Sequence, residues 1–250
     1  MHFRYGKPPK PGHPEAWTLT DVSLDIRADS TLGVVGESGS GKSTLIRVLC
    51  GLLHHQQGAV TFDGRDIGDW LKSSPRDLRR RNQIVFQSPR RSLDPRMSIR
   101  RSLSQPVRAL ERRAPTNAEL ADALARVGLG AEILPRFPHQ LSGGQLQRVG
   151  IARALSVGPD VLYADEPVSA LDVSVQAQVL NLLMDVRSQL GLALVMVSHD
   201  LGVVSRLCEE VIVLKKGVIV AAGRTSEVFA APPDRYTASL VTAARAASLT

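Results

Sequence analysis

The sequence predicts an α/β fold that carries a helical insertion, and three observations lead to this prediction. Residues 31–35 form a short apolar run, TLGVV, which is typical of a buried strand. A glycine-rich turn at 36–41 follows this run, and residues 43–50 have the pattern of a helix that ends at Gly51. Further strand signals occur up to residue 87 and again after residue 158, whereas residues 88–158 contain mainly helical signals.

The turn and the first residues of the helix match the pattern G-x-x-x-x-G-K-[ST] of a phosphate-binding loop. Its glycines allow successive backbone N–H groups to point at an anion, and the helix adds its partial positive charge. In such a loop Lys42 contacts the β- and γ-phosphates, and the Ser43 hydroxyl binds Mg²⁺. A plain turn rich in glycine and serine is the alternative. We predict that the chain binds a nucleoside triphosphate, with further contacts from Gly36, Ser38, Gly39, Ser40, Gly41 and Thr44.

The composition predicts a soluble, cytoplasmic protein. Its 250 residues are enough for one domain with a real hydrophobic core. The longest dense apolar run, 192–197, is far shorter than the ~20 residues that span a bilayer, and no signal-peptide pattern follows the polar start. Cys50 and Cys208 lack the spacing of metal ligands, so we expect them to be small core residues in a reducing compartment.

The net charge of +7 arises mainly in one middle segment of the chain. Nucleic-acid binding is one interpretation of such a cluster. A solvated or membrane-apposed basic face is the interpretation that we favour, because no aromatic stacking residues are interleaved with the arginines. The arginines of this segment are Arg76, Arg79, Arg80, Arg81, Arg90, Arg91, Arg96, Arg100, Arg101, Arg108, Arg112 and Arg113.

The N-terminal part is expected to contain strands on either side of a proline-rich loop at 7–14. Apolar residues alternate with polar ones at Leu19, Val22, Leu24 and Ile26, which is typical of a strand. An aromatic side chain of this region could stack on a nucleotide base. Our candidate is Tyr5, while Phe3 and Trp17 are alternatives, and each of the three could instead belong to the core.

The middle of the chain changes from strands to helices. Residues 59–62 read as a strand before a tight turn at Asp63 and Gly64, and residues 83–87 read as a strand that ends in Gln87. The sequence from Thr116 to Glu119 is a capping box that opens an amphipathic helix closed by Gly128. We take residues 88–158 as the helical insertion.

The run Leu141-Ser-Gly-Gly-Gln145 precedes another helical stretch, residues 146–155. Two glycines and a serine at a helix N-terminus form a second anion site by the same physics as the phosphate loop. Five fixed residues of this kind arise by chance only on the order of once in several thousand sequences of this size, so the motif is specific. Its predicted nucleotide-binding residues are Ser142, Gly143, Gly144 and Gln145.

Residues 160–165 form an apolar strand that ends in two carboxylates. Asp165 at the strand end can hold Mg²⁺, and Glu166 beside it can polarise a water molecule for in-line attack. Two adjacent surface acids are the alternative, but surface acids do not usually end a buried strand. A helix over residues 173–190, which follows Ser-Ala-Leu-Asp172, completes this part of the prediction.

The last third of the chain returns to the α/β core. A buried strand at 192–197 leads to His199, which we place on the ligand edge of the sheet, although a core or capping histidine is the alternative. Residues 211–220 are expected to form a hairpin, and residues 226–250 an alanine-rich tail.

These motifs, taken in order, resemble those of the nucleotide-binding subunits of ATP-binding cassette (ABC) transporters over essentially the whole chain. Finer features are similar to the branch that energises oligopeptide, dipeptide and nickel import. The segments that carry this finer resemblance are GESGSG at 36–41, VFQSP at 85–89, SLDPR at 92–96, LSGGQLQR at 141–148, VSALDVSVQAQ at 168–178, SHDL at 198–201 and RYTASL at 235–240.

The resemblance implies a P-loop NTPase core with a mixed central sheet, an antiparallel β subdomain and a helical subdomain. One cassette would then fill residues 1–250, with its core at 1–87 and 159–228, the helical subdomain at 88–158 and a tail at 229–250. One departure is Tyr163, which replaces the usual aliphatic residue of its strand and should be tolerated if its hydroxyl finds a partner.

The resemblance also implies roles for individual residues. Gln87 would link Mg²⁺ and the attacking water to the membrane partner, Glu166 would be the general base, and His199 would contact the γ-phosphate. Asp172 would help communication between two sites. Ser142, Gly143 and Gly144 would bind the γ-phosphate of ATP held by an opposite cassette.

A site completed by a second cassette implies a dimer. The chain ends without the cysteine-rich C-terminal extension of some relatives, so it resembles the shorter of two ATPase partners, and we expect a heterodimer more than a homodimer. The other implied partners are two permease subunits and an extracytoplasmic substrate-binding protein, with the chain at the cytoplasmic face of the inner membrane. No nucleic-acid partner is expected, and ATP and Mg²⁺ are the implied ligands.

Several alternatives remain open. Nickel or metal-chelate import would use the same cassette, because the cargo is selected by other subunits. A non-transport cassette ATPase acting on DNA or ribosomes is disfavoured by the single phosphate loop and the lack of a metal motif, and a small-molecule phosphotransferase has no use for the LSGGQ run. The chain could also be one half of a longer polypeptide with two cassettes.

Overall fold

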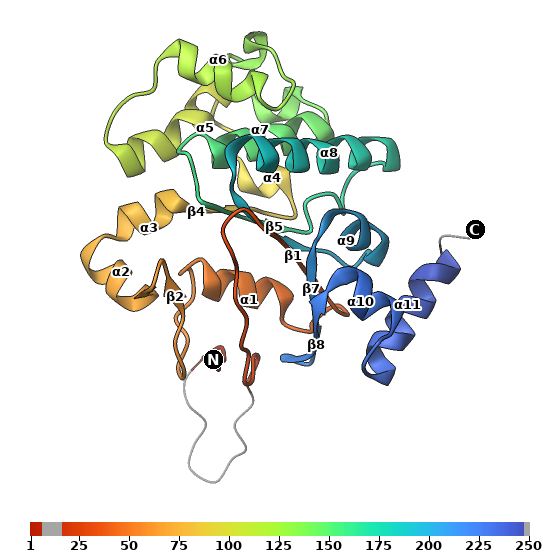
Figure 1. Cartoon of the computed structure of the whole chain (residues 1–250). Coiled ribbons are helices and arrows are strands. Elements are labelled where there is room, and N and C mark those ends of the chain that lie inside the picture. The colour runs from red at the N-terminus through yellow and green to blue at the C-terminus, as the bar shows by residue number, and fades with distance from the viewer. Residues whose placement is uncertain (7–16, 248–250) are drawn as a thin grey trace. The chain divides into compact units, whose positions relative to one another are not determined.

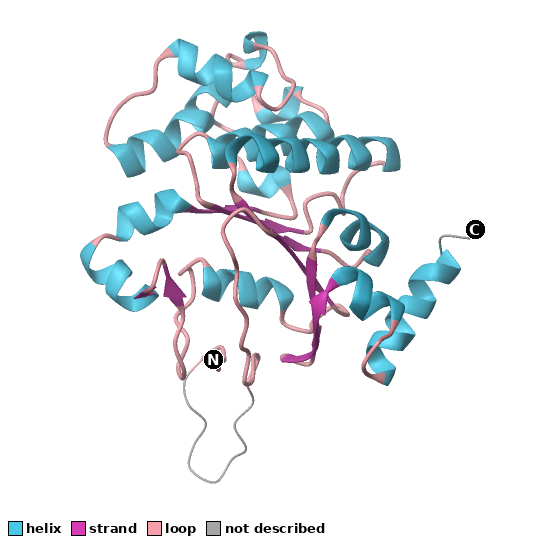
Figure 2. Cartoon of the chain, in the orientation of Figure 1, coloured by secondary structure: helices cyan, strands magenta, loops and turns pink. Residues whose placement is uncertain are grey.

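The computed structural model describes residues 1–6 and 17–247. The expected proline-rich loop at 7–14 and the last three residues of the expected tail lie outside the described residues. The chain divides into two compact units, Met1–Ser73 with Val195–Thr250, and Ser74–Leu194. Figures 1 and 2 show the helices and strands of these units. The α/β fold predicted from the sequence is confirmed, whereas the expected division at residues 87 and 158 stays a prediction.

The first unit is built on a mixed sheet. Its strands lie in the order β6-β1-β7-β8. Strand β1, Thr31–Val35, pairs in parallel with β7, Glu210–Lys215, and β7 pairs in antiparallel fashion with β8, Val218–Arg224. The end of β6, Ala193–Val197, belongs to this unit, and the Ser198 N–H donates to the Val34 carbonyl at 3.2 Å. All residues of β1 are buried, so this strand is central to the core.

Helices of the first unit come from both ends of the chain. Those of its N-terminal part are α1, Lys42–Leu49, and α2, Ile67–Ser73. A short hairpin, β2 at Thr61–Phe62 and β3 at Arg65–Asp66, lies before α2 and is the small antiparallel sheet of the structure. Its turn was predicted at Asp63 and Gly64, where both residues have positive φ.

The C-terminal part of the first unit contains three helices that pack together (Figure 1). They are α9, Leu201–Leu207, α10, Thr225–Ala230, and α11, Arg235–Ala247. Tyr236 and Val241 of α11 are buried. The segment that the sequence suggested only as an alanine-rich tail is therefore largely helical and anchored to the core through its few large side chains.

The prediction of strands between residues 17 and 26 is wrong. This segment contains only an isolated antiparallel bridge, between Phe3 and Leu19, and residues 1–6 add a second bridge, between His2 and Gln57. Leu19 and Val22 are buried, as their alternation with polar residues suggested. Leu24 and Ile26 are only partly buried. An extended segment can bury some of its side chains without a continuous ladder of strand hydrogen bonds.

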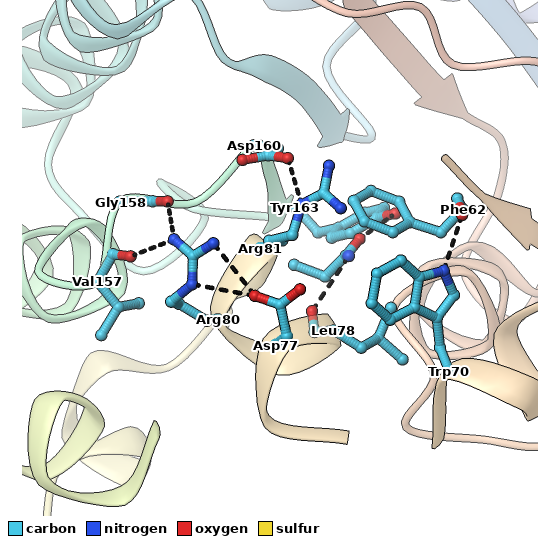
Figure 3. Close-up of polar contacts among 11 residues, drawn as sticks. Phe62, Trp70, Asp77, Leu78, Arg80, Arg81, Val157, Gly158, Asp160 and Tyr163 are labelled. Atoms are coloured by element: carbon cyan, nitrogen blue, oxygen red, sulfur yellow. Dashed lines mark hydrogen bonds and ion pairs between the residues drawn. The ribbon is translucent and has the colours of Figure 1, made fainter. Parts of the chain in front are cut away.

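The second unit contains the strand that ends at the two predicted carboxylates, together with its parallel neighbour. Strand β4, Asn82–Val85, pairs in parallel with β5, Val161–Asp165, and β5 is followed in the sheet order by the first residues of β6. An ion pair joins Arg81 Nε to Asp160 Oδ2 at 2.6 Å just before these strands, and helix α3, Pro75–Arg81, leads into β4 (Figure 3). The Tyr163 hydroxyl donates to Asn82 Oδ1 at 3.3 Å, so the unusual tyrosine has the partner that its burial requires.

The remainder of the second unit is helical, as predicted. Helix α7, Gly143–Leu155, contacts four of its neighbours, which are α4 at Pro89–Ser92, α5 at Ile99–Pro106, α6 at Asn117–Ala125 and α8 at Val173–Leu190. A π-helix, η1 at Val107–Glu111, continues α5, and two 3₁₀ turns, η2 at Ala131–Ile133 and η3 at Pro138–Gln140, precede α7. The predicted capping box of Thr116 and Glu119 is present at the start of α6.

Two further expectations concern the membrane and the cysteines. Within the described ranges, no helix combines the length and the apolarity that crossing a bilayer requires. Cys50 and Cys208 are both unpaired and buried, as the sequence suggested. Burial raises the pKa of the Cys50 thiol to about 11 and that of Cys208 to about 12.

Candidate functional site

The phosphate loop lies between β1 and α1 of the first unit. Gly36 leaves the strand with φ of 150°, and a Cβ at this position would lie 2.1 Å from the Leu214 carbonyl oxygen. Any other residue would therefore clash with β7. Gly41, with φ of 106°, is the N-cap of α1 and turns the backbone into the helix. The sequence pattern and the backbone thus agree on a loop that ends at a helix N-terminus.

The polar atoms of this loop fit a phosphate ligand. Lys42 is buried, and its Nζ donates to the carbonyl oxygens of Gly36 and Glu37 at 2.7 and 2.8 Å. The Ser40 hydroxyl is buried without a hydrogen-bond partner among the residues that the structure describes. A buried hydroxyl without a partner is costly, and phosphate oxygens are acceptors that would satisfy it.

Tyr5 is the one of the three predicted stacking candidates that contacts the start of α1. Its hydroxyl lies 3.1 Å from the Thr44 hydroxyl, and its side chain is 54% exposed. Phe3 is buried in the core and packs edge-to-face against Tyr5, and Trp17 lies against His2. The arrangement favours Tyr5 as an aromatic surface beside the nucleotide loop, and its stacking on a base stays a prediction.

One residue of the loop's surroundings was missed from the sequence. The Tyr236 hydroxyl of α11 accepts the backbone N–H of Glu37 at 3.0 Å, and Lys215 Nζ lies 4.5 Å from the centre of the Tyr236 ring. Asp234 fixes the start of α11, because its carboxylate accepts the backbone N–H groups of Tyr236 and Thr237 at 2.8 and 3.1 Å. The run Arg235-Tyr-Thr237 was part of the family resemblance, but nothing in the sequence alone connects it to residue 37.

His199 follows the end of β6 in the first unit, as predicted. Strand β6 neighbours β1, and the hydrogen bond of Ser198 to Val34 places the histidine next to the point where β1 enters the phosphate loop. Asp200, the residue after His199, caps α9 by accepting the N–H groups of Gly202 and Val203. His199 is exposed and lies at the wall of a cavity of about 520 Å³ beside α9 and α11. A γ-phosphate contact by His199 stays a prediction.

In the second unit, Gln87 and Glu166 lie in contact. Asp165 is the last residue of β5 and is buried, and Glu166 follows it. Gln87, two residues beyond β4, donates from Nε2 to Glu166 Oε2 at 2.8 Å. Because β4 and β5 are parallel neighbours, their carboxyl ends bring both side chains to one edge of the sheet.

The backbone of Glu166 has an uncommon conformation. Its φ is 46°, in the left-handed region that residues with a side chain rarely adopt. The turn that follows stabilises this conformation, since the Glu166 carbonyl accepts both the backbone N–H and the hydroxyl of Ser169, at 3.3 and 3.2 Å. Local strain of this kind tends to occur at functional sites, where the rest of the structure fixes one side chain in place.

The LSGGQ run begins helix α7 of the second unit. Ser142 is the N-cap, and its side chain forms a reciprocal capping box with Gln145 at 3.0 and 3.2 Å. A Cβ at Gly144 would lie 2.5 Å from Val175 Cγ1 of α8, so the second glycine permits close packing of the two helices. The sequence suggested an anion site here. The structure provides the helix N-terminus for it, and nucleotide contacts of these residues stay a prediction.

Next to this helix start, α8 presents an exposed turn. Asp172 is the N-cap of α8, yet its side chain caps nothing and has no hydrogen bond among the described residues. The next residue, Val173, is 83% exposed, which is high for a large apolar side chain. An unused carboxylate and an exposed valine beside the LSGGQ helix indicate a surface available to a partner.

Comparisons with known proteins show which family this chain is similar to. A match to the family described as ABC transporter covers residues 19–169. A protein of Sinorhizobium fredii, named a probable peptide ABC transporter ATP-binding protein, is 47% identical over 235 residues, which are 92% of this chain and 66% of that protein. The glutathione import ATP-binding protein of Pectobacterium atrosepticum is 45% identical over 224 residues, 89% of this chain and 36% of that protein.

The chain therefore spans less than two thirds of the length of either relative. Among solved structures, the dimeric ATP-binding cassette MJ0796 in a post-hydrolysis state, bound to ADP and Pi, has a TM-score of 0.77 at 29% identity. That match covers 90% of this chain and 97% of the other.

Proposed function

Because the chain belongs to the ABC transporter family, we propose that it binds and hydrolyses ATP to energise an importer for peptides. The observation that carries the proposal is the pair of Gln87 and Glu166 at the carboxyl ends of β4 and β5. An amide that holds a carboxylate at a sheet edge suits a general base that orients water. The names of the relatives, which refer to peptide and glutathione import, support a peptide cargo.

Each unit would contribute its own residues to the reaction. In the first, Lys42 and the backbone of the phosphate loop would bind the phosphates, Tyr5 would stack on the base and His199 would contact the γ-phosphate. In the second, Glu166 would take the proton of the attacking water, and Gln87 would keep the carboxylate in place. Hydrolysis of ATP needs such positioning more than covalent chemistry.

The proposed magnesium ligands are all oxygen donors. The Ser43 hydroxyl would bind the ion in the first unit, and the Asp165 carboxylate and the Gln87 amide oxygen would do so in the second. Hydroxyl, carboxylate and amide oxygens are the ligands that Mg²⁺ prefers. When bound, the ion would neutralise charge on the phosphate oxygens.

We further propose that the chain acts in a pair of cassettes. The N-terminus of α7 at Ser142 and Gly143, with the exposed turn at Asp172 and Val173, would face ATP and residues of a second cassette. The dimeric structure of the neighbour supports this arrangement. A heterodimer is favoured over a homodimer, and the pair would act on two permease subunits at the cytoplasmic face of the inner membrane, with an extracytoplasmic binding protein that delivers the peptide.

The test is ATP hydrolysis by the purified chain, alone and with a candidate partner cassette, in wild type and in Glu166→Gln. We expect Glu166→Gln to lower kcat by about 10²–10⁴-fold, the usual contribution of a general base, and to leave ATP binding intact. Glu132→Gln, a matched change at an exposed position in the same unit, should leave kcat unchanged.

Two results would refute the proposal. A Glu166→Gln variant as active as wild type would exclude Glu166 as the base. Full activity of the single chain at high dilution would exclude the need for a second cassette, because a site completed by a partner loses activity when the partners dissociate. Activity that rises strongly with the partner cassette and disappears with Glu166→Gln would support both parts.

A further inference from the structure

We propose that the second unit contains a binding site for a phosphate group, in a cavity of about 330 Å³ formed by α5, η1 and the start of α6. Three arginines line this cavity, Arg100, Arg101 and Arg108. None of the residues that line it is acidic. The ligand would be an anionic phosphate ester, either the headgroup of a phospholipid or a free phosphate compound.

The spacing of the polar residues along α5 and η1 is the first argument. Arg101, Ser104, Gln105 and Arg108 follow one another at steps of three, one and three residues, so they lie on one face of the helix and all line the cavity. Other positions of the same helix, Ile99, Leu103 and Val107, are fully or almost fully buried. A helix commonly has one apolar face and one polar face. Here the polar face lines a cavity, and all its charged residues are positive.

The second argument is the lack of neighbouring acids for these arginines. Within the described part of the chain, the side chains of Arg101 and Arg108 have no hydrogen bond or ion pair, and the Arg100 guanidinium donates to the Asn117 side chain. Arg113, only five residues beyond Arg108, is different, because its guanidinium pairs with Glu111 and Glu119 at 2.8 and 2.7 Å.

The first two acids after these arginines in the sequence, Glu111 and Glu119, thus pair with Arg113 instead. Three cations around one cavity repel one another, and this repulsion is relieved by an anion. The positive charge around the cavity therefore favours a negatively charged ligand, which none of the residues lining the cavity provides.

The chemistry of the arginines selects phosphate among anions. A guanidinium presents a planar fork of donors that matches two oxygens of a phosphate. A phosphate monoester offers three free oxygens and up to about two negative charges. The phosphate diester of a lipid offers two free oxygens and one negative charge. Helix α5 also continues into a π-helix at Val107, and π-helical turns occur frequently at functional sites.

The proposal that the phosphate belongs to a lipid rests on the proposed function, because only a cassette that works at a membrane comes into contact with lipid headgroups. Cytoplasmic leaflets are rich in anionic lipids, and clustered Lys and Arg side chains near them strengthen binding. A soluble phosphate compound as the source does not depend on the proposed function.

The experiment compares the full-length wild type with three paired variants, all saturated with ADP so that the phosphate loop is filled. The cavity pair is Arg101→Ala with Arg108→Ala. The charge-matched control is Arg76→Ala with Arg126→Ala, two exposed arginines of the same unit outside the cavity. The third pair, Arg101→Lys with Arg108→Lys, keeps the charge but removes the forks. Binding is measured to phosphatidylcholine vesicles with and without phosphatidylglycerol, and to glycerol 3-phosphate.

If a lipid occupies the site, the cavity pair should bind phosphatidylglycerol vesicles about tenfold more weakly than wild type, and the control pair only a few-fold more weakly. The lysine pair should also lose most of its binding, because an ammonium group lacks the bidentate geometry. If a soluble phosphate is the ligand, glycerol 3-phosphate should bind to wild type and to the control pair but not to the cavity pair, while vesicle binding falls equally in the cavity and control pairs.

Three results would overturn the proposal. An equal loss in the cavity and control pairs with both probes would mean that only net charge matters, and wild-type binding of both probes by the lysine pair would mean the same. Binding of neither probe to wild type would assign the cavity to another ligand, such as an acidic protein segment. ATPase activity is measured in parallel, with the candidate partner cassette present, and should be unchanged in the cavity pair. If the wild type lacks ATPase activity even with that cassette while the vesicle results hold, the proposed function fails and the phosphate site remains.

Discussion

Tyr236→Phe tests whether helix α11 positions the phosphate loop. The tyrosine hydroxyl accepts the Glu37 N–H at 3.0 Å, and the ring is 8% exposed with Lys215 Nζ 4.5 Å from its centre. Phenylalanine keeps the packing of the ring and its contact with the lysine, so the substitution removes only the acceptor. A hydrogen bond of this kind contributes about 1 kcal/mol net, which corresponds to a fall in Tm of about 2–4 °C in a protein of this size.

The same bond should affect nucleotide binding. Glu37 is the second residue of the loop, and its N–H is fixed only 3.0 Å from the hydroxyl of a buried side chain. If the bond helps to hold the loop in its binding conformation, its loss weakens ATP binding by up to about fivefold, because 1.4 kcal/mol corresponds to a factor of ten. Titration calorimetry with ATP and thermal melts of the same samples measure both effects.

Tyr163→Phe is the matched control, since it removes a buried tyrosine hydroxyl bond in the second unit, to Asn82 at 3.3 Å. It should lower Tm by a similar amount and leave the affinity for ATP unchanged. If Tyr236→Phe lowers Tm but binds ATP as tightly as wild type, the bond is merely structural and the reasoning is refuted. Equal losses of affinity in both variants would refute it as well, because they would reflect general loosening.

Three further predictions use other sites. Gly144→Ala places a Cβ 2.5 Å from Val175 Cγ1, so it should lower the free energy of unfolding by about 1–3 kcal/mol, and adding Val175→Ala should restore most of the loss in thermal melts. Burial raises the pKa of Cys50 to about 11 and of Cys208 to about 12, so both thiols should react slowly with a disulfide reagent near neutral pH until the protein unfolds. Because burial favours the protonated thiols, they contribute stability below pH 9.0, the ordinary pKa of a thiol. This contribution is lost as the pH rises through the pKa values of about 11 and about 12. The pKa of Glu119 is lowered from 4.5 to about 2, because its carboxylate accepts hydrogen bonds from the Arg113 side chain and from the Thr116 backbone N–H of the capping box. The stability that this carboxylate contributes should therefore be present above pH 4.5 and be lost as the pH falls toward 2. Acid unfolding of Glu119→Gln, compared with wild type, measures this difference.

Much of the fold was predictable because local signals determine it. The helix over residues 173–190 was predicted with the bounds that the structure has. The capping box at Thr116 and the hairpin of β7 and β8 were also predicted at the correct positions. Caps, turns and apolar periodicity act over a few residues, so they can be read from the sequence without knowledge of the rest of the molecule.

The prediction failed where a distant partner decides the structure. Of the alternating residues between Leu19 and Ile26, only Leu19 and Val22 are buried. A strand also needs a continuous neighbour, and only Phe3 forms a bridge with this segment. The segment after residue 225 was expected only to be an alanine-rich tail, yet it forms α10 and α11. A few buried side chains, Phe229, Tyr236 and Val241 among them, anchor these helices, and short sequence windows do not show such contacts.

The same distinction between local signals and distant contacts applies to the predicted site residues. The places of Asp165 and Glu166 at the end of β5, and of His199 just after β6, were predictable because strand ends are local features, while the roles of these residues stay predictions. The left-handed φ of Glu166 is also local in origin, because it is held by Ser169, three residues away.

The contact of Tyr236 with Glu37 joins residues 199 positions apart, and no local rule relates them. The two kinds of contact have different consequences. A strand-end carboxylate can be located in any chain with the same motif, whereas the residue that supports the phosphate loop depends on how α11 packs against α9 and α10. Variation among relatives in the segment after β8 would then change how the loop is held without changing the motif itself. The support of the loop, rather than its glycines and lysine, is therefore the part of the first unit that only the structure identifies.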